Sequence, residues 1–147
     1  MSVFDVIDQI QELSPCAAVR YRIKRILRQE IDSELFEEFY NSKWVELLKA
    51  NQLGDGGYGR FHSRNSKIKQ KFPTTEIAVD SIKMLDIQRG NPLVDKLCDY
   101  MEKILKREIE WPDGFEKNRW YRSAQPLFVA SKLSIFGSKC REYTEIF

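Results

Sequence analysis

The chain has 147 residues, of which 42% are hydrophobic and 31% are charged, and its net charge is +2. This size and composition are typical of one globular domain and exclude a disordered chain. The small net charge gives no support to nucleic-acid binding, and no run reaches the roughly 18 apolar residues of a membrane span. The first residues are acidic, unlike a secretion signal, so we expect a cytoplasmic protein.

The cysteines give no sign of a disulfide framework or a metal site. The chain has three, at Cys16, Cys98 and Cys140, whereas such sites need more cysteines in closer pairs. We interpret them as thiols in or near helices, and we expect no metal and no cofactor.

Four apolar stripes at helical spacing cover the first fifty residues, at positions 3–13, 16–27, 31–39 and 44–48. Ser2 and Asp5 predict a capping box for the first helix. Ser14 and Pro15 predict the N-cap and first position of the second helix. Asn41 marks a break before the fourth.

The helical pattern stops over residues 51–73, which hold four of the seven glycines. A loop of this length inside a domain is usually functional. Thr74 or Thr75 is expected to cap the next helix, with an apolar stripe formed by Ile77, Ala78, Ser81, Met84 and Leu85. Gly90 is expected to close that helix.

Asn91 and Pro92 predict the start of a further helix, which buries Val94, Leu97, Cys98, Met101, Ile104 and Leu105. Residues 111–114 have turn chemistry, and Pro126 should kink or split the last helix. No stretch has the alternating β-branched pattern of a sheet, so the predicted fold is all-α, built from stacked helix pairs.

A glycine-rich motif follows the fourth predicted helix. Residues 44–52 lead into Asp55-Gly56-Gly57-Tyr58-Gly59. This helix end, with its Gln and its Asp-Gly-Gly-aromatic-Gly, resembles the Gln-to-Trp repeat of the terpenoid cyclases and protein prenyltransferases. A second, degraded copy lies 57 residues further on, where residues 104–106 and 114–115 match 47–49 and 57–58.

The resemblance implies part of an α/α toroid over about residues 42–136. Together with N-terminal helices in 1–41 and a tail in 137–147, it would form a single helical domain. It further implies that Tyr58, where the family usually has Trp, packs between neighbouring units. The family toroid uses about twice as many helices, so three alternatives stay open: half a toroid, a fragment of a longer protein, or a protomer that pairs in a homo-oligomer.

The catalytic motifs of the family are missing. The sequence has neither the Asp-x-Asp-Asp acid of class II cyclases nor the Asp-x-Cys of the prenyltransferase zinc site. No catalytic residue is therefore assigned, and Asp55, His62 and Asp113 are the ones to test. His62 has no evident carboxylate partner in the sequence. A zinc site from Asp55, His62 and a distant cysteine is a minor alternative.

Six residues are candidates to line an apolar ligand pocket: Trp44, Tyr58, Phe61, His62, Trp111 and Trp120. Aromatic residues at helix ends and turns more often form the core between helices, so both interpretations stay open. The Gly-x-Gly-x-x-Gly string at 54–59 should follow a helix, which argues against a nucleotide site.

These observations favour a helical-repeat module without its own chemistry. It would bind an apolar or isoprenoid-like ligand, or a protein partner, along a groove edged by residues 51–73. An alternative is a cyclase or prenyltransferase-like subunit completed by a partner chain or a missing segment. A weaker one is a nucleic-acid-binding protein that uses the basic residues of 20–28 and 67–71.

Overall fold

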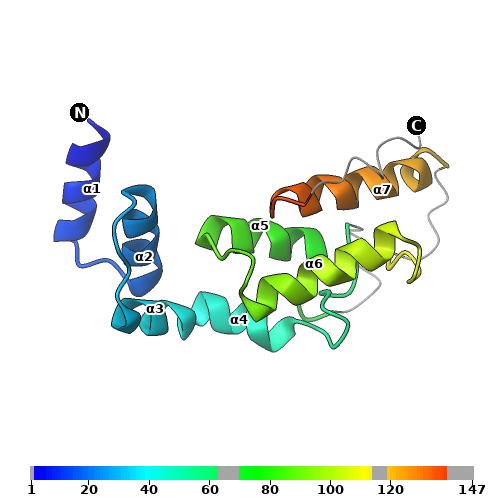
Figure 1. Cartoon of the computed structure of the whole chain (residues 1–147), viewed down its shortest axis with the longest axis horizontal. Coiled ribbons are helices and arrows are strands. Elements are labelled where there is room, and N and C mark those ends of the chain that lie inside the picture. Colours follow the sequence, from blue (N-terminus) through cyan, green and yellow to red (C-terminus); the bar gives the residue numbers. More distant parts are fainter. Residues whose placement is uncertain (1, 63–69, 114–118, 139–147) are drawn as a thin grey trace. The chain divides into compact units, whose positions relative to one another are not determined.

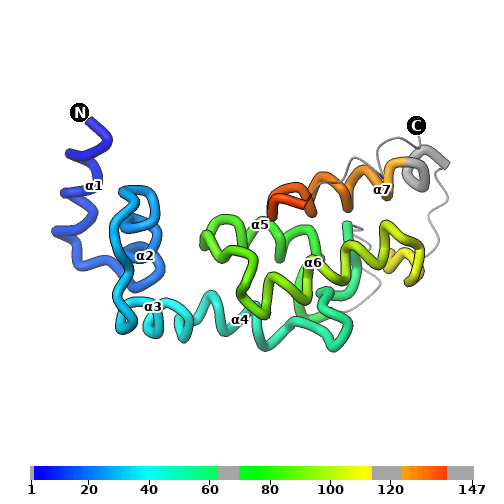
Figure 2. The backbone as a smooth tube through the Cα atoms, in the orientation of Figure 1, coloured from blue at the N-terminus to red at the C-terminus, as the bar shows by residue number. Residues whose placement is uncertain are grey.

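The computed structural model describes residues 2–62, 70–113 and 119–138, and the side chains of 119–123 lie outside its description. The described residues form helices and loops, with no strand (Figures 1 and 2), which confirms the all-α prediction. The helices are α1 (Val3–Glu12), α2 (Ala17–Ile26), α3 (Ser33–Tyr40), α4 (Lys43–Asn51), α5 (Thr75–Leu85), α6 (Pro92–Leu105) and α7 (Arg119–Ser134). No helix in these ranges is long and apolar enough to cross a bilayer.

The chain divides into two compact units, Met1–Ala50 and Asn51–Phe147. In the first, α2 packs against α3, and the ring of Tyr21 stacks on that of Phe39 with 3.9 Å between centroids. Ile23 of α2 and Leu35 of α3 are also buried. Two exposed ion pairs tie the same helices together, Arg20–Glu38 and Lys24–Asp32.

The predicted capping box of α1 is confirmed, because Ser2 and Asp5 exchange both hydrogen bonds. The predicted start of α2 is wrong. Ser14 has a left-handed φ of 50° and its N–H donates to the carbonyl of Gln11, so it belongs to the end of α1. Pro15 lies in the connector, and Cys16 is the N-cap.

In the second unit, α6 is the central element. It packs against α7, and its buried residues include the predicted Val94, Leu97, Cys98, Met101 and Ile104. Leu105, which was also predicted to be buried, is partly exposed. Asn91 caps it, with Pro92 at the first position, as predicted.

The predicted buried face of α5 is partly wrong. Thr74 is the N-cap, but Ile77 and Met84 are 43% and 75% exposed. Of the predicted stripe, Ala78 is buried, and the other buried residues of the helix are Thr75, Val79 and Ile82. The shift arises because the loop before α5 bonds to the Thr75 side of the helix.

The predicted helix ends also need correction. α5 ends at Leu85, its C-cap Asp86 takes the left-handed conformation, and the N–H of Ile87 donates to the carbonyl of Ile82. Gly90 therefore lies in the following turn. Pro126 does not split α7, which runs on through it. The two repeat copies also differ in register, because α4 continues past residues 47–49 whereas α6 ends at Leu105; residues 114–115 lie outside the described ranges.

Candidate functional site

The glycine motif forms a tight loop that lies on α6. The side-chain amide of Gln52 donates to the carbonyl of Gly56 (3.0 Å) and to that of Leu93 in the first turn of α6 (2.9 Å). The carboxylate of Asp55 accepts from the N–H of Gly57 at 2.9 Å. Asp55 therefore shapes the turn, and as predicted the Gly-x-Gly-x-x-Gly string follows a helix and not a strand.

Two glycines allow this loop to lie close to α6. A Cβ on Gly56 would be 2.2 Å from the carbonyl oxygen of Lys96, and Gly56 has a φ of +95°. A Cβ on Gly57 would be 2.6 Å from the ring of Tyr100. Both distances are far below van der Waals contact, so only glycine fits at either position.

The next residues join the loop to the start of α5. The N–H of Tyr58 donates to the hydroxyl of Thr75 (3.0 Å), and the N–H of Thr75 donates to the carbonyl of Arg60 (2.8 Å). The N–H of Glu76 donates to the carbonyl of Phe61 at 3.1 Å. The first turn of α5 therefore satisfies its free N–H groups with the loop as well as with its Thr74 cap.

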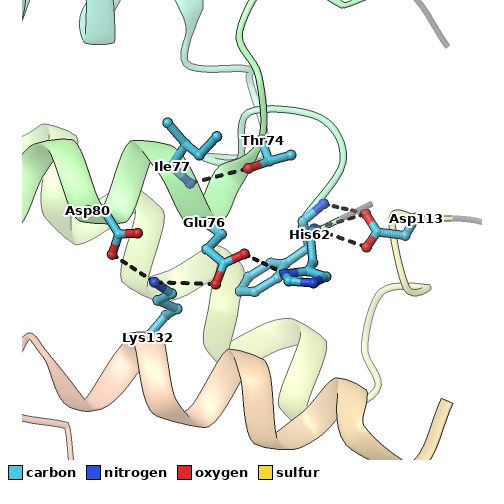
Figure 3. A network of polar contacts seen from close by, with 8 residues as sticks. His62, Thr74, Glu76, Ile77, Asp80, Asp113 and Lys132 are labelled. Carbon is cyan, nitrogen blue, oxygen red and sulfur yellow. Dashed lines mark hydrogen bonds and ion pairs between the residues drawn. The ribbon is translucent and has the colours of Figure 1, made fainter. Parts of the chain in front are cut away.

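Asp113 fixes the end of the loop from the other side. The residue is only 6% exposed. Its carboxylate accepts hydrogen bonds from the N–H of Phe61 (2.5 Å) and from that of His62 (3.0 and 3.2 Å). Figure 3 shows the carboxylate facing this backbone. These bonds give Asp113 a structural role.

His62 has the carboxylate partner that the sequence did not reveal. Its Nδ1 pairs with Glu76 on α5, and its ring stacks on Phe128 of α7 with 4.8 Å between centroids. The Nζ of Lys132, also on α7, lies 3.3 Å from Glu76 and 2.7 Å from Asp80 (Figure 3). One polar network thus connects the loop, α5 and α7.

The charges in this network stabilise one another. Burial lowers the pKa of Lys132, but the hydrogen bond to Asp80 and the negative charges of Glu76 and Asp80 outweigh it, so the pKa is raised above its ordinary value. Lys132 is therefore a fixed cation and not a proton donor at neutral pH. The network could be found only in part from sequence, since Glu76 and Lys132 are 56 positions apart.

The aromatic candidates that the structure describes have different surroundings. Tyr58 and Phe61 are buried core residues, 2% and 0% exposed, and Phe61 packs against Trp111 with 5.3 Å between centroids. Trp44 belongs to the first unit and is 48% exposed, with the Nζ of Lys43 4.7 Å from its ring. The side chain of Trp120 lies outside the described residues.

Two buried tyrosines and a cysteine flank this core. Burial raises the pKa of Tyr58 and of Tyr100, and it raises the pKa of the Cys98 thiol to about 11. These groups are uncharged at neutral pH and poorly suited to nucleophilic chemistry. Within the described ranges, no three His, Cys, Asp or Glu side chains come together as metal ligands.

A groove of about 420 Å³ lies at the carboxyl end of α6, beside α7. Its apolar lining consists of Ile104, Leu105, Ile109, Trp111 and Pro126. Arg107, Glu108, Glu110 and Gln125 add polar groups. None of these residues belongs to the 51–73 loop, where the sequence predicted the groove, and among the sequence candidates whose side chains are described only Trp111 takes part. The connector 106–110 carries no motif that would have identified it.

The comparisons with known proteins found no match: no family model, no curated protein and no solved structure is similar to this chain.

Proposed function

We propose that this chain is a helical binding module without chemistry of its own, which holds a short apolar and basic segment of a partner protein in the groove between α6 and α7. The observation that carries the proposal is the groove itself. Its volume of about 420 Å³ falls within the range of small ligand sites, which are mostly apolar with a few placed polar groups.

The residues that could do chemistry are already engaged. Asp55 bonds to Gly57, Asp113 bonds to two backbone N–H groups, and His62 pairs with Glu76. The bonds of Asp55 and Asp113 fix the backbone of the loop, and the His62–Glu76 pair holds the loop to α5. Binding therefore explains the unit better than acid–base catalysis, which needs a group that can exchange its proton with a substrate.

The groove has an unpaired polar group that suits a peptide backbone. The Nε1–H of Trp111, a lining residue, has no acceptor among the described residues, and a peptide carbonyl in the groove would supply one.

The charges of the groove favour a basic segment over a diphosphate. Glu108 and Glu110 flank Ile109, and Arg107 is the one cation among the described lining residues. A Lys or Arg beside an apolar anchor would complement the two carboxylates, whereas an isoprenoid diphosphate would be repelled.

The family resemblance remains a proposal of its own. What supports it is the loop, because Gly56 and Gly57 lie against α6 and Tyr58 is buried. The absent catalytic motifs separate this chain from the family's enzymes, and fold alone would not assign an activity.

The test follows the indole N–H signal of Trp111 by NMR while the full chain is titrated with the capped peptide Lys-Leu-Lys-Phe-Lys-Leu. Binding should shift this signal, and Ile109→Ser should weaken binding by about tenfold or more, since burying such a side chain contributes roughly 1.5–3 kcal/mol. Ile77→Ser, which changes an exposed residue of α5, is the matched control and should bind normally.

An unmoved Trp111 signal, or equal binding by the Ile109 variant, would refute the groove as the binding site. A parallel titration with farnesyl diphosphate, with and without Mg²⁺ or Zn²⁺, tests the enzyme alternative. A metal-dependent rise in melting temperature that His62→Ala or Asp55→Ala abolishes would overturn the non-catalytic proposal.

A further inference from the structure

The helix α1 leaves most of its apolar face exposed. Its capping box is complete, yet Ile7 is its only buried residue. Ile10 is partly exposed. Four further large apolar residues are exposed: Val3 by 69%, Phe4 by 66%, Val6 by 41%, and Leu13, the C-cap of the helix, by 80%. A well-capped helix with this much unburied apolar surface requires another surface to cover it.

The charges of the first unit are arranged in blocks of one sign. Positions 2–13 contain three carboxylates and no base, namely Asp5, Asp8 and Glu12. Positions 17–28 contain five bases and no acid, namely Arg20, Arg22, Lys24, Arg25 and Arg28. α1 is therefore an acidic amphipathic helix, and α2 is a basic one.

An exposed strip of α2 complements α1 both in its apolar surface and in its charge. One side of α2 faces α3, which pairs with Arg20 and Lys24. Val19 and Ile26 are 38% and 57% exposed, and Arg22 lies between them at i+3 and i−4, on the same side of the helix. This strip is apolar with a basic edge.

The edge of α1 has the opposite charge. Phe4, Asp8 and Glu12 follow one another at i+4 and form one row along the helix. The apolar face of α1 therefore has an acidic border, which complements the basic border of the Val19–Ile26 strip.

We propose that two copies of this chain associate through these surfaces, with α1 of each copy lying on the Val19–Ile26 strip of the other. The contact is made twice and is related by a two-fold axis, as in most homodimers. It involves only the first unit, so it is independent of the groove beside α7. Pairing of α1 with α1 would instead place acidic rows together.

The experiment is a pair of charge-reversed full-length chains studied by sedimentation equilibrium. The first variant carries Asp8→Lys and Glu12→Lys, and the second carries Arg22→Glu and Arg25→Glu. Reductant is present throughout because the exposed Cys16 could otherwise link two copies covalently. Far-UV circular dichroism checks that each variant keeps its helices.

Each variant alone should dimerise at least about tenfold more weakly than the wild type, because both of its contacts bring like charges together. The equimolar mixture should recover dimers, because every contact in the mixed pair joins opposite charges. Phe4→Ser with Leu13→Ser should also give monomers, whereas Phe36→Ser, on an exposed residue of α3, should leave the dimer unchanged.

Three results would overturn the proposal. The first is a wild-type chain that stays monomeric at the highest concentration reached. The second is normal dimerisation of the Arg22→Glu and Arg25→Glu variant on its own, which would indicate α1–α1 pairing. The third is a mixture that remains monomeric although both variants are folded, which would show that α1 of one copy does not lie on α2 of another.

Discussion

Asp113 shows how a single carboxylate can organise a loop. It lies 51 and 52 positions from His62 and Phe61, yet its two oxygens accept both of their backbone N–H groups. Those N–H groups are part-buried or buried. An unpaired buried N–H costs a folded protein more than a typical hydrogen bond contributes.

We expect Asp113→Asn to destabilise the second unit by about 1–3 kcal/mol, because the amide has one acceptor in place of two and places an NH₂ group against an N–H. Urea unfolding measures the loss. Asp99→Asn removes an exposed carboxylate paired with Lys103 and should change stability by less than about 0.5 kcal/mol. Equal effects of the two substitutions would contradict the role given to Asp113.

At the scale of the element, α3 depends on the charge of its cap. The carboxylate of Asp32 accepts from the N–H of Leu35 at 2.8 Å and from Lys24 at 2.9 Å. The hydrogen bond from Lys24 and then that from Leu35 lower the pKa of Asp32 from 3.8 to about 2. Both hydrogen bonds are strongest when the carboxyl group of Asp32 is ionised.

This lowered pKa predicts how the stability of α3 changes with pH. Above pH 3.8 the contribution of Asp32 is fully present; it is lost as the pH falls from 3.8 towards 2, because the unfolded chain takes up the proton first. Carbon NMR of the Asp32 carboxyl should give a midpoint near 2. Asp32→Asn should lack this part of the acid sensitivity, and a midpoint near 3.8 would disprove the argument.

At the scale of the whole molecule, each of the two units encloses core residues of its own. Phe39 in the first unit is 1% exposed, and Met101 in the second is fully buried. A chain with two compact units need not unfold in one step. Tryptophan fluorescence can follow the two units separately, because Trp44 belongs to the first unit and Trp111 and Trp120 belong to the second.

We expect Phe39→Ala to lower the stability of the first unit by about 3–5 kcal/mol, and Met101→Ala to lower that of the second by about 2–5 kcal/mol. Urea unfolding is followed by tryptophan fluorescence in Trp44→Phe, which reports on the second unit, and in a Trp111→Phe and Trp120→Phe double variant, which reports on the first. If both core substitutions shift both signals equally, the chain unfolds as one unit.

Local signals predicted the caps and the fold class well. Ser2 with Asp5, Thr74 and Asn91 are caps in the structure because each side chain bonds to a backbone only two or three residues away. The start of α2 was mispredicted because Ser-Pro has the same composition in a connector as at a helix start. Here the left-handed Ser14 ends one helix and does not begin the next.

Long-range partners could not be predicted from local patterns. Apolar residues on both sides of α5 are consistent with either face being buried, and the loop on Thr75 decides between them. His62 finds Glu76, and Asp113 finds the His62 backbone, only because the chain folds back on itself. The groove beside α7 likewise depends on where residues 106–111 lie relative to Pro126.

The close contact between Gly57 and the ring of Tyr100 limits how this sequence can diverge. A side chain at position 57 would occupy the space of the ring, so a larger residue there requires a smaller one at position 100. In an evolving lineage the two positions must therefore change together or not at all. Joint conservation of this pair would identify distant relatives even after most of the surrounding sequence has been replaced.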